Sequence, residues 1–593
     1  MLTDKKGSEK IILISYLIII GFAIIMIRLW QLQILQGSEL RQTSVSNRLK
    51  IIGVPAPRGI IFDRNTLPLV KNTAYFCASL IPEEFENKNV PSLAKLLNMP
   101  AEELSGKIAK KSRNLFAPVR LKGGLSFDEV SFIEARRSDF PGLIIDVELS
   151  RHYIYGSAGS HLIGYLGKLS PAQLKDPEFR DVPPDAFIGQ WGVEKMFDKS
   201  LRGTAGQRVI EVDALGHEIR LLQEINPVKG KDLTLSIDIA LQNEAEKAFD
   251  GKTGALVALD PNTGEVLGFV SSPSFDPNKF VKGISSGEWH SLTEDEKIPL
   301  LNRAVQSQYP PGSTFKIITA IAGLEEGVIN NKTKVNCKGR INVGKWHFGC
   351  WRKTGHKILS IHRAIVESCD VYFYEVGKRL GIDKINFYAL MLGLGEETGI
   401  TVGRERKGLI PSSKWKMETK KEPWFLGETF ISAIGQGFVS VTPVQMAVMM
   451  STVANNGTVY QPSILKDSTP VIRKKADIRP ETFEIVKDGL KGVVNERGGT
   501  GWVAKSDKII IGGKTGTAQV VGIRKDSKYL PEKQRDHAWF VAFAPVEKPE
   551  IALSVFVEHG GHGGSAAAPI AKKAIDAYLL PEEKKRKLLN VQN

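Results

Sequence analysis

The amino-acid sequence predicts a multidomain α+β protein with one N-terminal transmembrane helix. Three observations support this: an apolar run without charges near the N-terminus, a change in the residue pattern at 226–230, and the patterns of a hairpin, helices and strands after residue 230. That order is typical of an antiparallel sheet with helices packed on it. The expected parts are a cytoplasmic tail at 1–10, an anchor at 11–30, a pedestal domain at 31–228, an enzyme domain at 229–580 and a charged tail at 581–593.

The composition is that of a globular protein with several domains. The chain has 593 residues, of which 42% are hydrophobic and 24% charged, so most of it can bury a core. A net charge of +15 suits an anionic membrane surface or nucleic acid. Because the sequence has neither zinc-finger spacing nor an aromatic ribonucleoprotein motif, we expect a membrane and no nucleic acid as partner.

The first element is a membrane anchor. Ile11–Ile27 carries no charge, and the span reaches residue 30 if Arg28 snorkels. Lysines within 1–10 precede the span, which favours a cytoplasmic N-terminus and an exported remainder. A cleaved signal peptide would end in a small-residue cleavage site, and none follows. We therefore expect an uncleaved, single-pass anchor.

The enzyme-like pattern begins after the pedestal, which contains no catalytic cluster. A turn at Pro261–Gly264 separates two strand-like runs and predicts a hairpin. Helical periodicity marks Ser313–Glu326 and Ile361–Leu380. Three late segments are predicted as strands: Ile509–Ile511, Ala538–Ala544 and Ile551–Glu558.

Ser313 is the candidate nucleophile. Two prolines and Gly312 precede it, and an apolar, helix-compatible segment follows, so we expect Ser313 at a helix N-terminus with Lys316 one turn on. A serine hydroxyl needs an adjacent base, and a lysine serves if burial and a second cation lower its pKa. Ser-x-x-Lys also occurs at Ser92, Ser413 and Ser463, and a lone serine here is usually an N-cap. Only Ser313 has the Pro-Gly entry.

Two further motifs follow along the chain. Ser368-Cys369-Asp370 places a second hydroxyl and a polar side chain between helices, where they could relay a proton and hold a substrate amide. Alone it is more typical of a helix cap. Lys514-Thr515-Gly516-Thr517 follows the strand predicted at Ile509–Ile511. A glycine in such a strand allows a substrate backbone to approach, and the lysine supplies charge for a terminal carboxylate.

The three motifs, in this order, resemble the signature of the penicillin-binding protein and serine β-lactamase superfamily. Arg58–Arg64 resembles the first N-terminal motif of class B penicillin-binding proteins, with Asn65 in place of the usual glycine. Gly192–Glu194 and Leu201–Gly206 resemble later pedestal motifs. Tyr309-Pro-Pro-Gly and Asp370 are similar to the elongation type. The resemblance implies a dimerisation-type pedestal and an antiparallel sheet with helices on both sides.

The resemblance also implies residue roles in peptidoglycan cross-linking. Ser313 attacks the D-Ala–D-Ala carbonyl of a stem peptide, Lys316 is the general base, and Ser368 assists proton transfer to the leaving amine. Lys514, Thr515 and Thr517 hold the carboxylate, Gly516 admits the substrate backbone, and the N–H groups of Ser313 and Thr517 form the oxyanion hole. Asp370 cannot donate an amide N–H to substrate, as the usual asparagine does.

Three of the four cysteines lie near the second motif. Cys337 and Cys350 could form a disulfide in an oxidising compartment, leaving Cys369 free. Alternatively, these three thiolates and His356 match a structural tetrahedral zinc site. Free thiols are a third possibility. The stretch Cys350–His356 resembles a Trp-x-Lys-x-Gly-His segment of elongation-type enzymes. No cofactor is expected for catalysis.

The resemblance implies an enzyme of the bacterial inner membrane with its catalytic domain in the periplasm. Its expected partners are stem peptides, β-lactams, a RodA-type glycosyltransferase and other rod-shape morphogenesis proteins. A D,D-carboxypeptidase would share the chemistry, and a non-catalytic morphogenesis scaffold would share the pedestal. A β-lactamase would need a deacylating glutamate, and a β-lactam sensor would normally have several spans. Loss of function in Ser313→Ala separates an enzyme from a scaffold.

Overall fold

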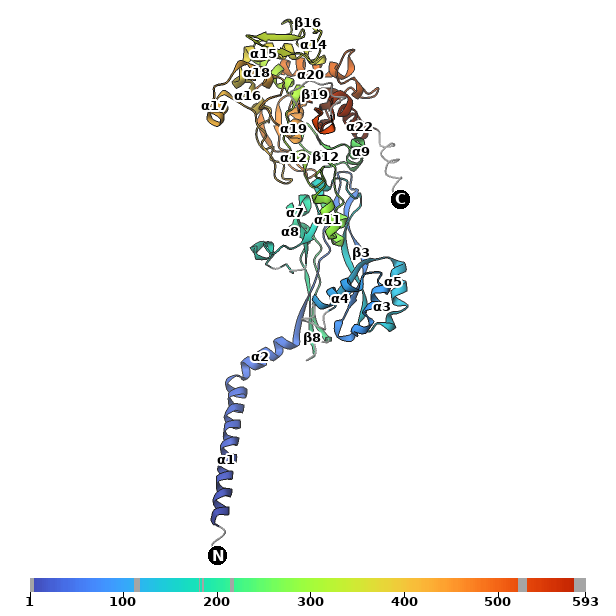
Figure 1. The fold of residues 1–593 in the computed structure, drawn as a ribbon, viewed down its shortest axis with the longest axis vertical. Helices are drawn as coiled ribbons and strands as arrows, with labels where there is room; N and C mark the ends of the chain where they lie inside the picture. Colours follow the sequence, from blue (N-terminus) through green and yellow to red (C-terminus); the bar gives the residue numbers. More distant parts are fainter. Residues whose placement is uncertain are drawn as a thin grey trace. The chain divides into compact units, whose positions relative to one another are not determined.

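The computed structural model describes residues 5–110, 118–180, 182–183, 186–213, 218–520 and 531–580, so the tail expected at 581–593 lies outside the described residues. The chain forms two compact units (Figure 1). The first comprises Met1–Pro57, Ala74–Leu149 and Arg202–Gly230. The second comprises Arg58–Thr73, Ser150–Leu201 and Lys231–Asn593. Segments from both sides of residue 228 therefore build the second unit.

The N-terminal helix has the length and composition of a membrane span. It comprises α1 (Lys5–Trp30) and a π-helical turn, η1 (Gln31–Leu35), and α2 (Gly37–Arg48) follows. The stretch Glu9–Leu35 contains an 18-residue window with a mean hydropathy of 2.7, and none of that window is buried. Among the described residues it is the one helix long and apolar enough to cross a bilayer. The span continues past the expected end at residue 30, because no helix breaker occurs before Gly37.

The first unit contains an antiparallel sheet and a small helical core. The sheet order is β1 (Leu49–Val54), β8 (Gly206–Val212) and β9 (Glu218–Ile225). The core packs α3 (Val90–Leu96), α4 (Ala101–Lys110) and α5 (Phe127–Glu134) with β4 (Val119–Leu125), which pairs with residues 76–80 of β3 (Pro68–Leu80). Buried leucines such as Leu93 and Leu104 fill it.

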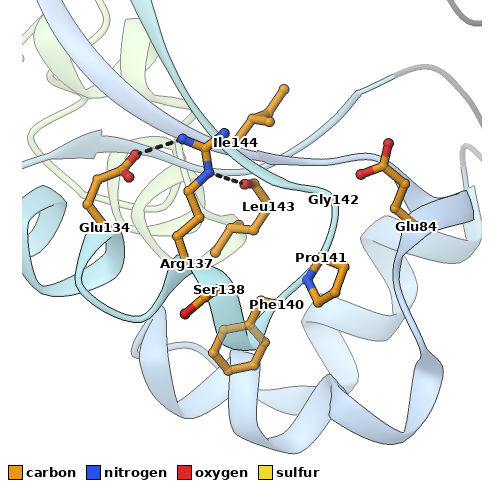
Figure 2. A pocket seen from close by; sticks show the side chains of 9 residues that line it. All are labelled: Glu84, Glu134, Arg137, Ser138, Phe140, Pro141, Gly142, Leu143 and Ile144. Carbon is orange, nitrogen blue, oxygen red and sulfur yellow. Dashed lines mark hydrogen bonds and ion pairs between the residues drawn. The ribbon is translucent and has the colours of Figure 1, made fainter.

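A pocket of ≈ 400 Å³ lies in the first unit (Figure 2). Arg137 is one of the lining residues. Its guanidinium donates to the carbonyl of Leu143 at 3.1 Å and lies 3.5 Å from a carboxylate oxygen of Glu134. Glu84 and Phe140 complete much of the lining. None of the catalytic or metal-binding residues expected from the sequence lines this pocket.

The core of the second unit is a five-stranded sheet with the order β12-β11-β21-β20-β19. The strands are β11 (Gly254–Leu259), β12 (Val266–Ser272), β19 (Gly512–Ala518), β20 (His537–Ala544) and β21 (Ile551–Val557), and all neighbours are antiparallel. Every residue of β11 and β21 is buried. Because successive side chains point to opposite faces, both faces of the sheet are covered.

Helices cover the sheet (Figure 1). The pair α9 (Ile239–Phe249) and α22 (Ala568–Leu579) packs together and against the sheet, and α19 (Pro443–Ala454) also packs on it. The expected antiparallel sheet with helices is confirmed, as is the hairpin around Pro261–Gly264. The other α-helices between residues 231 and 580 of the described chain are α10 (Asn278–Lys282), α11 (Ser286–Thr293), α12 (Arg303–Gln306), α13 (Lys316–Glu325), α14 (Ile361–Val366), α15 (Asp370–Leu380), α16 (Ile382–Met391), α17 (Ser413–Lys420), α18 (Leu426–Ala433), α20 (Pro480–Asn495) and α21 (Gly563–Ala566).

Three predicted elements differ from the structure. The strand predicted at Ile509–Ile511 is wrong: the strand is β19, built of glycine, threonine, lysine and alanine, whose sequence lacks the apolar pattern that normally reveals a strand. The helix predicted from Ser313 begins with a 3₁₀ turn, η7 (Gly312–Phe315). The helix predicted over Ile361–Leu380 is broken, because Ser368 has the left-handed φ of 53°.

A buried ion cluster joins the segment that resembles the first N-terminal motif to the segment Gly192–Glu194. The Glu194 side chain is 0% exposed and accepts from Arg58 Nε at 2.8 Å and from Arg151 Nε at 2.7 Å. Asp198 lies 2.9 Å from the same Arg58 guanidinium. Burial alone would raise the pKa of Glu194, but Arg151 and Arg58 outweigh it and lower that pKa. The carboxylate therefore stays charged and compensates two buried cations.

Replacing Glu194 by alanine is expected to destabilise the second unit by about 3–5 kcal/mol, since two buried guanidinium groups would lose their counter-ion. Thermal melting of the full-length protein in detergent measures the change. Glu103→Ala is the matched control, because Glu103 pairs with Lys107 at 2.7 Å on an exposed helix face and should contribute under about 1 kcal/mol. Equal melting points for the two variants would contradict the expectation.

Candidate active site

The segment that carries Ser313 is held tightly against the edge strand of the sheet. Gly312 has a φ of 55°, and its N–H donates to the carbonyl of Gly435 at 2.9 Å. A Cβ at Gly312 would lie 2.4 Å from the carbonyl oxygen of Thr517, so only glycine permits this approach. Ser313 is half-buried in the 3₁₀ turn η7, which lies directly beside β19 and leads into α13.

Lys316 is the first residue of α13 and is 0% exposed. Its ammonium donates to Asp370 Oδ1 at 2.7 Å, to the carbonyl of Ser368 at 2.8 Å and to Ser368 Oγ at 3.3 Å. Ser368 and Asp370 come from the break between α14 and α15, where the left-handed Ser368 turns the chain. The first two motifs are therefore joined by a buried ion pair and a shared hydroxyl.

Lys514 extends from the middle of β19 and is also 0% exposed. Its ammonium donates to Ser368 Oγ at 2.8 Å and to the carbonyl of Thr515 at 3.1 Å. Burial lowers the pKa of Lys514 well below its ordinary value, and the nearby Lys316 lowers it further, while Asp370 opposes the shift. The Ser368 hydroxyl thus lies between two buried side-chain nitrogens, and the lowered pKa of Lys514 weakens its hold on its proton.

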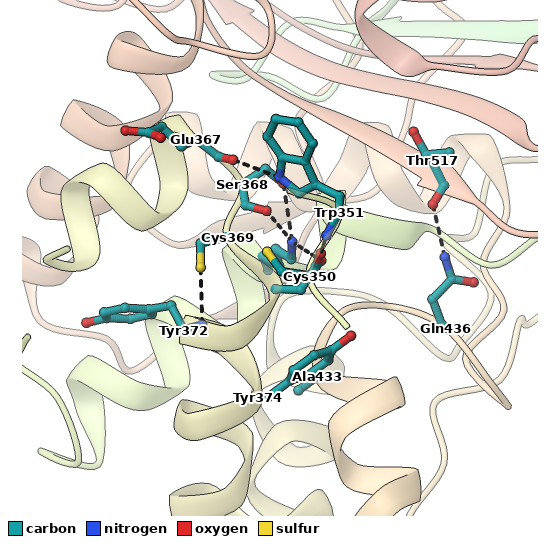
Figure 3. Close-up of polar contacts among 12 residues, drawn as sticks. Cys350, Trp351, Glu367, Ser368, Cys369, Tyr372, Tyr374, Ala433, Gln436 and Thr517 are labelled. Atoms are coloured by element: carbon teal, nitrogen blue, oxygen red, sulfur yellow. Dashed lines mark hydrogen bonds and ion pairs between the residues drawn. The ribbon is translucent and has the colours of Figure 1, made fainter. Parts of the chain in front are cut away.

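The remainder of the third motif lines the exposed edge of the sheet. Thr515 Oγ1 donates to Thr500 Oγ1 at 2.7 Å, and Gln436 Nε2 donates to the carbonyl of Thr517 at 2.9 Å (Figure 3). A Cβ at Gly516 would lie 2.7 Å from the carbonyl of Pro311. Gly516 is therefore needed for packing against the turn before Ser313, in addition to the substrate approach expected of it.

The site also contains residues that the sequence motifs did not single out. Trp351 is 54% exposed, yet its N–H donates to Asp370 Oδ2 at 2.8 Å and its indole donates to the carbonyl of Glu367 at 3.1 Å (Figure 3). Thr500, the partner of Thr515, lies in a Gly-Gly-Thr-Gly segment. The glycine-rich segment around Thr500 was the feature of the sequence that could have indicated its place in the site. For Trp351, that feature was the resemblance to the Trp-x-Lys-x-Gly-His segment.

The cysteine cluster lies immediately behind the second motif. Cys337, Cys350, His356 and Cys369 are buried, and their ligand atoms all lie within 4.8 Å of one another. His356 Nδ1 is 3.6 Å from Cys337 Sγ and 3.5 Å from Cys350 Sγ. Zinc bonds of about 2.3 Å to sulfur and 2.0–2.1 Å to nitrogen, at tetrahedral angles, would separate these atoms by about 3.5–3.6 Å. The donor set and the two nitrogen–sulfur distances therefore fit zinc.

The thiols of this cluster are free, so the structure does not contain a Cys337–Cys350 disulfide. A hydrogen bond from Cys369 lowers the pKa of the Cys350 thiol, and the same bond raises the pKa of Cys369. The arrangement thus favours a thiolate at Cys350, which is the form that binds metal. On its other side, His356 Nε2 lies 4.0 Å from Glu367 Oε2, where a carboxylate can orient a metal-bound imidazole.

Comparisons with known proteins identify the domains that these residues occupy. The Penicillin binding protein transpeptidase domain matches residues 254–576, and the Penicillin-binding Protein dimerisation domain matches residues 53–235. The chain belongs to the penicillin-binding proteins. It is an acyl-transfer enzyme of this family, and the expected relationship to class B members is confirmed by its relatives.

Those relatives match nearly the whole chain. Peptidoglycan D,D-transpeptidase MrdA of Acinetobacter baumannii is 37% identical and covers 96% of this chain and 87% of its own. Penicillin-binding protein 2 of Helicobacter pylori, solved in complex with MreC, has a TM-score of 0.78 and 32% identity, covering 90% of this chain and 99% of its own. A peptidoglycan synthase complex that coordinates polymerization and crosslinking contains a chain with a TM-score of 0.73 and 32% identity, covering 96% and 98%.

Proposed function

We propose that this penicillin-binding protein cross-links peptidoglycan stem peptides during cell elongation, through an acyl-enzyme at Ser313. The observation that supports this most directly is the Ser368 hydroxyl between the buried ammonium groups of Lys316 and Lys514, behind the turn that carries Ser313. Proton transfer to and from a serine nucleophile requires such desolvated amines. The near full-length likeness to an MrdA transpeptidase supports peptidoglycan as the substrate.

In the proposed acylation step, Lys316 reacts as the neutral amine: Ser313 Oγ attacks the penultimate D-Ala carbonyl and transfers its proton to Lys316 Nζ. Asp370, 2.7 Å from Lys316 Nζ, stabilises the ammonium that forms. The Ser368 hydroxyl then passes a proton to the departing D-Ala amine, and Lys316 replaces that proton. The carboxylate of Asp370 is itself fixed by a hydrogen bond from the backbone N–H of Trp351. In this proposal Asp370 acts on the general base Lys316, and it does not need to donate an amide N–H to the substrate.

The edge strand β19 supports the proposed mode of substrate binding. It is the last strand in the sheet order and pairs only with β20 within the described sheet, so its other backbone edge can pair with an extended peptide. The N–H groups of Ser313 and Thr517 would hold the developing oxyanion, and each such donor is typically worth about 3–4 kcal/mol of barrier. Lys514, Thr515 and Thr517 would bind the terminal carboxylate. A β-lactam would enter the same way and remain bound to Ser313.

We place the enzyme domain on the periplasmic side of the inner membrane, tethered by α1. The lysines before the apolar run support this orientation. The related structures contain MreC in one case and a peptidoglycan synthase complex in the other, which supports a morphogenesis partner and a RodA-type polymerase for this chain. The cross-link would then form close to newly polymerised glycan.

We further propose that Cys337, Cys350, Cys369 and His356 hold a structural zinc ion. The metal would fix the position of Cys369, and therefore of its neighbours Ser368 and Asp370. It would do the same for Cys350, whose neighbour Trp351 donates to Asp370. Zinc in this role takes no part in the chemistry. It holds the segment with Cys350 and Trp351 against the loop that carries Ser368 and Asp370.

Ser313→Ala is expected to abolish covalent labelling by fluorescent penicillin, because the other hydroxyl in the turn before Lys316, that of Thr314, is buried and donates to the carbonyl of Pro311. Full-length wild type should carry a label that survives boiling in detergent. Ser92→Ala is the matched control, since Ser92 begins another Ser-x-x-Lys and is exposed. Loss of label in Ser92→Ala, or its persistence in Ser313→Ala, would exclude Ser313 as the nucleophile. No label on wild type would favour the scaffold interpretation.

Binding of a D-Ala–D-Ala peptide to the Ser313→Ala variant is expected to take up a proton. At a pH between the lowered pKa of Lys514 and the ordinary lysine pKa of about 10.4, the Lys514 side chain is neutral in the free enzyme. A bound substrate carboxylate would favour its ammonium form. Calorimetry at several pH values below about 10.4, each in buffers with different ionisation enthalpies, measures the uptake. Adding Lys514→Arg should remove it, because arginine stays protonated. Buffer-independent heats with Lys514 present would contradict the assignment.

The purified protein is expected to contain about one zinc ion per chain. Cys350→Ser should lose the metal and lower the melting temperature, since the site would keep only three of its ligands. Cys77→Ser is the control, because Cys77 is buried and lies outside the cluster. Elemental analysis and thermal melting provide the two measurements. A metal-free wild type prepared without chelator would overturn the zinc proposal.

A further inference from the structure

The Tyr309 side chain, four residues before Ser313, is linked to the end of strand β21 in the central sheet. Its hydroxyl donates to the carboxylate of Glu558, the residue that follows β21. Glu558 Oε2 in turn lies 3.5 Å from Nε of Arg303, whose side chain is buried. Arg303 is fixed by donation to the carbonyls of Ile298, at 3.1 Å, and Lys297, at 2.6 Å.

The ring and backbone of Tyr309 are fixed as well. The ring stacks on Phe556 with centroids 4.0 Å apart, and meets the edge of His537 at 5.0 Å. The backbone exchanges two hydrogen bonds with Val441, at 3.0 and 2.9 Å. Both aromatic partners belong to the sheet, since Phe556 lies in β21 and His537 begins β20. The hydroxyl therefore adds a polar attachment to a ring that already has a defined position.

The segment between Tyr309 and the nucleophile contains no regular helix or strand before η7. Two other bonds hold it: Trp539 Nε1 donates to the carbonyl of Pro310 at 3.0 Å, and Gly312 N–H donates to Gly435. These bonds restrain the segment from strand β20 and from the loop after α18. The Tyr309–Glu558 bond restrains its start. The position of Ser313 relative to Lys316 and β19 therefore depends on where Tyr309 is anchored.

The electrostatics of the pair favour a permanent hydrogen bond. Burial raises the pKa of the Tyr309 hydroxyl above its usual range, and the Glu558 carboxylate raises it further, so the phenol stays neutral and donates. Arg303 balances the charge of Glu558. None of the proton transfers proposed for Ser313, Lys316 and Ser368 uses this phenol, so its effect on the reaction would be geometric.

We infer that Tyr309 and Glu558 are a pair of positioning residues that fixes the turn carrying Ser313 and thereby sets the rate of acylation. The inference rests on the proposed acyl-enzyme at Ser313. Small errors in the position of a nucleophile reduce the chemical step strongly, by up to about 100-fold for a shift near 1 Å. Substrate contacts that lie on β19 would be unaffected, so binding before the reaction should change little.

The test is stopped-flow acylation of the full-length protein by a chromogenic β-lactam, which separates the initial binding constant from the acylation rate constant. Tyr309→Phe keeps the ring contacts and removes only the hydroxyl. Glu558→Gln keeps an acceptor and removes the charge that faces Arg303. The double variant tests whether the two residues act as a unit. Tyr388→Phe is the matched control, because Tyr388 also donates to a glutamate, Glu326, at 3.0 Å.

The expected result is a fall of about 10–100-fold in the acylation rate constant for Tyr309→Phe, with the binding constant within about twofold of wild type. Glu558→Gln should lie between wild type and Tyr309→Phe, and the double variant should be no slower than Tyr309→Phe. The Tyr388→Phe control should react as wild type. A wild-type rate in Tyr309→Phe, or additive losses in the double variant, would overturn the pairing.

The melting temperature distinguishes positioning from general destabilisation. Tyr309→Phe and Tyr388→Phe should melt within a few degrees of each other, while only the first loses acylation. Equal losses of acylation in both variants would overturn the positioning role. Failure of the underlying acyl-enzyme proposal is recognised separately, because then wild type itself would not be acylated, or Ser313→Ala would be acylated as fast as wild type.

Discussion

The hydroxyl of Ser368 lies between the ammonium groups of Lys316 and Lys514, and the rest of the site is arranged to make this contact possible. Two like charges in a buried space repel each other and lose their hydration, so one carboxylate, Asp370, must lie beside them. The left-handed turn at Ser368 brings that carboxylate and the hydroxyl to the same point. The lysines themselves come from a helix and from an edge strand, which the sheet packing holds at a fixed separation.

Close backbone contacts provide this rigidity. Gly312 and Gly516 have no Cβ at positions where one would collide with Thr517 or Pro311. The turn and the strand can therefore touch along their backbones, and the three motifs meet although they are far apart in the sequence. On the opposite side, Trp351 and the cysteine cluster brace Asp370 and the loop that carries it. Each motif is thus supported by neighbours that its own sequence does not reveal.

The sequence singled out the three motifs that the structure brings together, and it predicted the apolar N-terminal helix, the hairpin and the antiparallel sheet, because each has a local signature. Ser313 follows a Pro-Gly entry, and Pro261–Gly264 is a turn signal flanked by apolar runs. The strand at β19 was misplaced because its residues are small or polar and gain their strand conformation from pairing with β20. The contact of Trp351 with Asp370 and that of Tyr309 with Glu558 join distant segments, so no local pattern could predict them.

The buried Lys514 has a consequence for the stability of the free protein. Its ammonium is desolvated and faces a second cation, so protonating it works against folding at neutral pH. Such a residue is retained for activity at the expense of stability, as is common in active sites. An anionic ligand that neutralises this charge binds only the folded state and should therefore shift the unfolding equilibrium. Binding of an anionic ligand at Lys514 and resistance to unfolding are therefore thermodynamically linked through this one lysine side chain.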